Sequence, residues 1–89
     1  MKNIDIELTI TDEAQLNRIR TFLEQLKICR ESENDYIVNG GRILLTNKKP
    51  GRWIIELLNI PGQLIDDVSR ALYGNVIRII PSNEIMEYR

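Results

Sequence analysis

The chain has 89 residues, of which 43% are hydrophobic and 28% charged, and its formal net charge is −1. This length allows one domain with a single small core, and the composition argues against disorder. The small net charge provides no overall field that favours nucleic acid or an anionic membrane as partner. One cysteine excludes an internal disulfide, and the lack of histidine removes the commonest general base and zinc ligand.

The N-terminal third predicts a strand followed by a helix. Apolar and polar side chains alternate strictly over residues 4–10, IDIELTI, which is typical of a strand with one buried face. Thr11 is a good helix N-cap because two acidic residues follow it in the first turn. Apolar residues at helical spacing then predict an amphipathic helix that runs to about Ile28: Leu16, Ile19, Leu23 and Leu26.

The middle of the chain reads as strands joined by tight turns. Residues 31–35, ESEND, predict a polar connection, and residues 36–38 predict a short strand. An Asn-Gly pair then indicates a hairpin turn into the strand RILLT, since this pair readily adopts positive φ. The sequence NKKPG at 47–51 indicates a second turn, and RWIIELL at 52–58 predicts a more central strand.

The C-terminal third predicts a second helix and a last strand. Pro61 suits the first turn of a helix, and Gly74 suits its C-terminal cap. Residues 75–80 predict a strand, and the tail 81–89 is expected to form a short edge strand or to fray. The apolar face of the helix consists of Leu64, Ile65, Val68, Ala71 and Leu72.

These elements predict a single α+β domain over residues 1–89, in the order β-α-β-β-(β)-α-β. We expect a two-layer sandwich of the ferredoxin-like (split βαβ) type, with two helices on one face of a mostly antiparallel sheet. The inner α-β-β-β-α order is also that of a double-stranded-RNA-binding domain, as an analogy of topology only.

The uncovered face of such a sheet is predicted to carry both charged and apolar side chains. Asp5, Glu7 and Thr9 are expected there from the first strand, and Glu56 and Arg78 mark the same side of two later strands. With them come the residues that we predict to form a protein interface: Ile54, Leu58, Val76 and Ile80, with Leu44 as a further member. The alternative is that the tail covers this face through Ile85, Met86 and Tyr88.

A basic segment is the second candidate site. No acidic residue occurs from residue 36 to 55, while the segment contains Arg42, Lys48, Lys49 and Arg52. These residues could contact phosphates, with Trp53 stacking on a base. The alternative is a solvated turn with Trp53 in the core, because Trp53 should point away from the side of Glu56. In a homodimer the basic residues could instead meet the acidic Glu31, Glu33 and Asp35 of a partner.

No motif predicts catalysis, a metal site or a cofactor. Cys29 follows an apolar helical run, which indicates a buried, inert thiol. Asp66 and Asp67 are neighbours that point about 100° apart on a helix, so they cannot converge on one metal ion. The Gly40-Gly41 pair lacks the spacing of a nucleotide-binding loop. The sequence also contains no apolar run of membrane-spanning length and no secretory signal, so a cytoplasmic location is expected.

We therefore rank three hypotheses of function. The first is a small non-enzymatic protein-interaction module (an adaptor, regulator or accessory subunit) that self-associates as a dimer through the sheet face. The second is a nucleic-acid-binding module that uses the basic 42–52 hairpin. The third is a small-ligand-sensing regulatory domain, which rests on analogy of fold alone.

Overall fold

The computed structural model describes residues 2–27 and 29–81. Its elements are β1 (Lys2–Thr9), α1 (Glu13–Leu26), β2 (Cys29–Ser32), β3 (Asp35–Val38), β4 (Gly41–Lys49), β5 (Arg52–Ile60), α2 (Gly62–Ala71), a 3₁₀ turn (Tyr73–Asn75) and β6 (Val76–Pro81). The predicted α+β class and the two helices are confirmed. The expectation for the tail beyond Pro81 lies outside the described residues.

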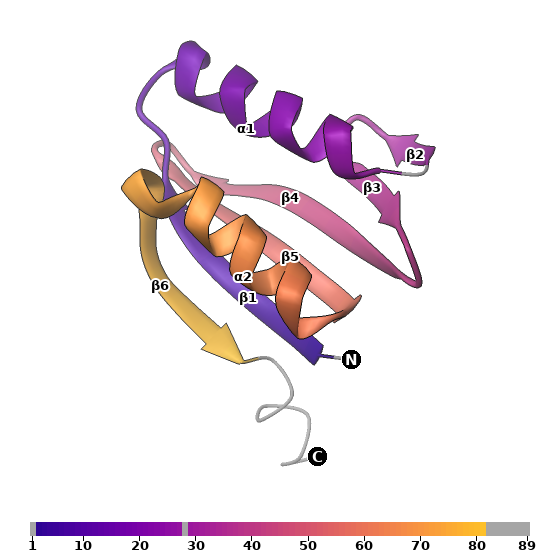
Figure 1. Ribbon diagram of the computed structural model, residues 1–89. Helices are drawn as coiled ribbons and strands as arrows, with labels where there is room; N and C mark the ends of the chain where they lie inside the picture. Colours follow the sequence, from indigo (N-terminus) through magenta and orange to yellow (C-terminus); the bar gives the residue numbers. More distant parts are fainter. Residues whose placement is uncertain (1, 28, 82–89) are drawn as a thin grey trace.

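The strands form one antiparallel sheet in the order β2-β3-β4-β5-β1-β6. Both helices lie over the same face of this sheet, and no described element covers the other face (Figure 1). The core lies between the helices and the sheet, where β1, β4 and β5 turn alternate side chains inward. Fully buried members of this core include Ile6, Leu8, Ile19, Leu23, Ile43, Ile55 and Leu57.

Helix α1 begins one residue later than predicted, because Asp12 rather than Thr11 is its N-cap. The Asp12 carboxylate accepts a hydrogen bond of 2.9 Å from the backbone N–H of Gln15. The Gln15 side chain in turn accepts one of 2.9 Å from the backbone N–H of Thr11. This reciprocal pair satisfies two backbone donors at the helix start, as in a capping box shifted by one residue.

The predicted polar connection after α1 is partly a strand. Residues 29–32 form β2, an edge strand that pairs with β3 and whose four residues are all exposed. An exposed edge strand needs no alternation of apolar side chains, so the sequence pattern gives no signal for it. The short strand expected at 36–38 is confirmed as β3.

A β-bulge near the end of β5 determines how the β3–β4 turn packs. Asn59 has a positive φ of 57°. Ile4 pairs with Leu57 and Lys2 with Ile60, so β5 contains one more residue than β1 between these pairs, and Asn59 is that extra residue. Its backbone N–H donates to the Asn3 side chain at 2.8 Å, and its side-chain amide donates to the carbonyl of Gly40 at 2.6 Å. The bulge therefore fixes the turn of one hairpin against the end of a neighbouring strand.

One buried polar side chain connects three parts of the fold. Asn75 is 5% exposed and follows α2. Its amide nitrogen donates to the carbonyl of Thr9 at 2.9 Å, and its amide oxygen accepts from Arg18 at 2.9 Å. Asn75 thereby joins the end of β1 to α1 and to the start of β6, and its buried polar atoms are hydrogen-bonded.

Candidate functional site

The open face, which we define as the side of the sheet turned away from the helices, carries five aliphatic side chains among the described residues. Cross-strand pairs place them: Ile37 opposite Arg42, Arg42 opposite Leu58, and Ile54 opposite both Thr46 and Glu7. All five are partly buried rather than fully exposed. They are Ile37, Leu44, Ile54, Leu58 and Ile80, so three of the four predicted interface residues lie together on this face.

The fourth predicted residue, Val76, lies on the opposite side of the sheet. On β6, Arg78 pairs with Glu7, but Val76 pairs with Leu8, so Ile77 is an extra residue in the strand. This bulge reverses the side on which the residues before it point. Val76 consequently packs against the core, and the expectation that it shares the open face is wrong.

Ion pairs cover part of the open face. The Glu7 carboxylate accepts a hydrogen bond of 3.0 Å from Arg52 and one of 3.3 Å from Arg78, so one carboxylate connects β5, β1 and β6. Further along the sheet, Nε of Arg42 lies 3.3 Å from a carboxylate oxygen of Asp35. That oxygen has no partner with hydrogen-bond geometry, so we describe this contact as an ion pair only.

Three charged side chains on this face have no ion-pair partner among the described residues. Glu56 lies in the middle of β5, opposite Leu44 and Asp5. Lys48 and Lys49 lie at the tip of the β4–β5 hairpin. There they line a cavity of about 190 Å³ together with Glu7, Arg52, Trp53 and Ile54. The open face thus has an acidic middle and a basic end.

The predicted basic segment is not one cluster. Arg42 pairs across the sheet with Leu58, whereas Lys49 pairs with Arg52 at the other end of the same strand. Seven residues separate Arg42 from Lys49, which is about 23 Å along a strand. The basic end instead includes Arg78, which the sequence pattern did not associate with the hairpin because it comes from β6. Trp53 packs partly buried against the core, as predicted.

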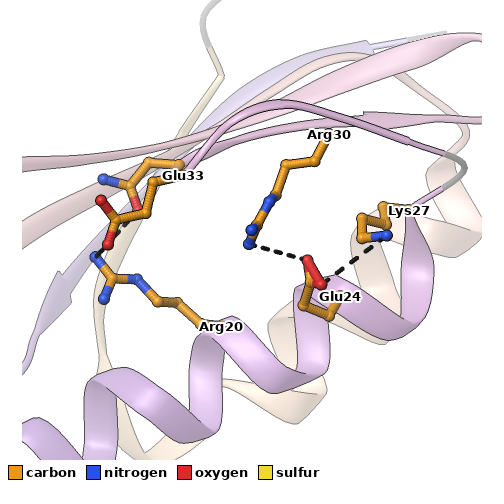
Figure 2. Close-up of polar contacts among 6 residues, drawn as sticks. Arg20, Glu24, Lys27, Arg30 and Glu33 are labelled. Carbon is orange, nitrogen blue, oxygen red and sulfur yellow. Dashed lines mark hydrogen bonds and ion pairs between the residues drawn. The ribbon is translucent and has the colours of Figure 1, made fainter.

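The acidic residues near β2 are used within the chain. Figure 2 shows Arg20 of α1 paired with Glu33 at 3.5 Å, and Glu24 between Arg30 and Lys27 at 3.1 and 3.9 Å. These contacts hold α1 against β2 and the turn that follows it. Glu33 and Asp35 are therefore already paired, which weakens the expectation that they receive the basic hairpin of a partner.

A second apolar surface, which sequence reasoning missed, lies where α2 borders β6. Two large apolar side chains are well exposed there, Tyr73 at 82% and Ile79 at 45%. Two adjoining cavities of about 440 and 390 Å³ share Ser69 and Ile79 as lining residues. We call this surface the α2–β6 edge. The alternation over residues 75–80 places Ile79 on the helix side of the sheet, opposite Ile6, but it could not reveal that this side chain stays exposed, because that depends on the place of β6 at the edge of the sheet.

The described residues contain no assembled catalytic or metal-binding group. Among residues 2–27 and 29–81, no three His, Cys, Asp or Glu side chains come together to hold a metal ion. Cys29 is exposed on β2, so the prediction of a buried thiol is wrong; α1 ends at Leu26, and Cys29 begins an exposed edge strand. No helix in the described part of the chain is long and apolar enough to cross a membrane.

In comparisons with known proteins, no family model, no curated protein and no solved structure matches this chain.

Proposed function

We propose that this chain is a small non-enzymatic protein-interaction module, an adaptor, regulator or accessory subunit, that self-associates through the open face. The observation that carries this proposal is the set of five partly exposed apolar side chains on the face of the sheet that no described element covers. Apolar side chains gathered on one surface are typical of a protein contact. The area of the face is near that of a protein interface. The six strands have 40 residues together, which at about 3.4 Å per residue and about 4.8 Å between strands gives roughly 650 Å² in projection, somewhat less than the ~800 Å² that each partner buries in a standard interface.

We also propose that the architecture is an elaborated ferredoxin-like arrangement. In support, β1 lies between β5, which precedes α2, and β6, which follows it. Two interleaved βαβ units produce this neighbourhood. The β2–β3 hairpin is then an insertion at the sheet edge, and the open face is the surface that such a sheet leaves uncovered.

The self-association is tested by sedimentation equilibrium of the full chain over a range of concentrations. The first variant is Leu58→Asp, which places a carboxylate opposite Arg42 and so creates a favourable cross-strand pair while it charges the apolar patch. The second is Ile54→Lys, whose ammonium would lie opposite Glu7. Both variants are expected to fold as the wild type does and to be monomeric where the wild type is dimeric.

Ile79→Lys on the α2–β6 edge is the matched control, since it adds the same charge to an apolar surface elsewhere. It is expected to leave the dimer intact. Dissociation by Ile79→Lys, with Leu58→Asp still dimeric, would move the contact to the α2–β6 edge and contradict the proposal. A wild-type chain that remains monomeric up to about 1 mM would contradict self-association altogether.

Nucleic-acid binding is a second candidate, favoured by one observation. Lys48, Lys49 and Arg52 surround a single cavity beside Trp53. Fluorescence anisotropy with labelled single- and double-stranded DNA and RNA at two salt concentrations tests it. A plot of log affinity against log salt concentration whose slope corresponds to contacts with roughly three phosphates would support this candidate, provided that the double variant Lys48→Glu/Lys49→Glu no longer binds. No binding at low salt would contradict it.

A further inference from the structure

We infer that the partner on the open face is a second copy of this chain, packed face to face. Each strand of one copy runs in the opposite direction to the equivalent strand of the other copy. In this arrangement Glu56 of each copy meets Lys48 and Lys49 of the other. The inference rests on the proposed function, because it specifies how the open faces meet. It is carried by the positions of the unpaired charges, by the sign of the charge along the strands and by the distance between the charged groups.

The unpaired charges on the open face complement one another. Glu56 is negative, Lys48 and Lys49 are positive, and none of the three has an ion-pair partner among the described residues. The other charges on this face are already engaged: Glu7 binds Arg52 and Arg78, and Asp35 pairs with Arg42. The charges left for a partner are therefore of both signs, which is what a surface needs to pair with a copy of itself.

These charges cannot meet within one chain. Glu56 pairs with Leu44 on β4, and Lys48 lies four residues further along that strand. Four strand residues span about 13 Å, which is beyond the reach of a direct ion pair. Two sheets that pack face to face lie about 10 Å apart, a distance that a glutamate and a lysine from opposite sheets span together.

The direction of the strands follows from where each sign lies. Asp35, Glu56 and Asp5 occupy one row across the sheet, because Leu44 pairs with both Asp35 and Glu56, and Glu56 pairs with Asp5. Lys49 and Arg52 occupy a row nearer the hairpin tip. If equivalent strands of the two copies ran in the same direction about a two-fold axis, each row would face the same row of the other copy. Like charges would then oppose one another. Antiparallel strands place the acidic row of one copy over the basic end of the other.

Charge reversal tests this arrangement with two variants that are compared with the wild type. Glu56→Lys would place its ammonium opposite Asp5, and Lys48→Glu/Lys49→Glu would place carboxylates beside Arg52, so both are expected to fold. Each variant alone should weaken the dimer about tenfold or more, because like charges then oppose one another at two symmetric positions. An equimolar mixture of the two should recover the wild-type dissociation constant, since both positions again pair opposite charges.

Asp67→Lys on α2 is the control for Glu56→Lys, because it makes the same change of charge at an exposed helix position off the open face. It should leave the dissociation constant unchanged. Sedimentation equilibrium and native mass spectrometry of the mixture provide the measurement, and a mass difference between the two variants identifies the heterodimer.

The possible results separate the two proposals. Recovery on mixing supports the antiparallel arrangement. A dimer that neither charge reversal weakens overturns this arrangement and leaves the proposed function standing. Weakening by each variant without recovery on mixing also overturns it, because the reversed groups then do not face one another. A wild-type chain with no tendency to dimerise overturns the proposed function and this inference together.

Discussion

Gly41 is the position where a single methyl group should damage this fold most specifically. A Cβ at residue 41 would lie 2.5 Å from the carbonyl oxygen of Asn59, still closer to that of Leu58, and 2.8 Å from Cδ1 of Ile60. The two oxygens belong to the backbone of β5, so they cannot move aside as a flexible side chain could. Gly41→Ala must therefore push β4 away from β5 or distort the bulge at Asn59.

The expected cost follows from these contacts. Overpacking against a rigid neighbour costs about 1–3 kcal/mol, and disturbing the Asn59 hydrogen bonds adds about 1 kcal/mol. We expect Gly41→Ala to lower the free energy of unfolding by about 3 kcal/mol, a large share of the roughly 4–13 kcal/mol typical of a domain of this size. The melting temperature should then fall by roughly 12–24 °C.

Urea and thermal unfolding, followed by Trp53 fluorescence and circular dichroism, measure this effect. Gly62→Ala is the matched control, because a Cβ at Gly62 would meet nothing within 4 Å. Gly62 lies in the first turn of α2, where alanine should stabilise the chain by about 0.5–1 kcal/mol. If the free energy of unfolding of Gly41→Ala lies within about 0.5 kcal/mol of the wild-type value, the close packing of β4 on β5 is refuted.

Three further predictions use the same unfolding assays or simple labelling. Asn75→Ala should lower the free energy of unfolding by about 2 kcal/mol, since it removes the bonds to Thr9 and Arg18; an effect below about 0.5 kcal/mol would contradict their importance. Tyr36→Phe should leave stability unchanged or raise it by about 1 kcal/mol, because the buried hydroxyl has no hydrogen-bond partner among the described residues, and a clear loss would contradict this reading. Cys29 should react with a thiol reagent in the native protein at nearly the rate seen in urea, and strong native protection would contradict its exposed position.

Most helices, strands and turns could be predicted from the sequence, because the spacing of apolar residues is a local property. Strict alternation over residues 4–10 requires one buried face, and the structure buries Ile6 and Leu8 accordingly. The turns at Gly40 and Gly51 were readable for a similar reason, since both residues adopt positive φ of about 80°. β2 was missed because its four residues face solvent, where no apolar pattern is required.

The candidate site was only partly readable, because it depends on which strands become neighbours. Alternation correctly grouped Ile54, Leu58 and Ile80 on one face, since each strand keeps its period. No local rule brings Arg78 of β6 to Glu7 of β1, 71 residues away in the chain, or separates Arg42 from the hairpin tip. Those relations follow from strand order and register, which long-range packing decides.

The sequence by itself determined the class of fold, the two amphipathic helices and the face on which most strand residues point. Only the tertiary structure decided what happens at the two bulges. An extra residue at Asn59 buries Ile60, and an extra residue at Ile77 turns Val76 toward the core. A bulge inserts one residue, and the alternation continues on either side of it. Its position is therefore determined by pairing with the neighbouring strand and not by the sequence of the bulged strand alone.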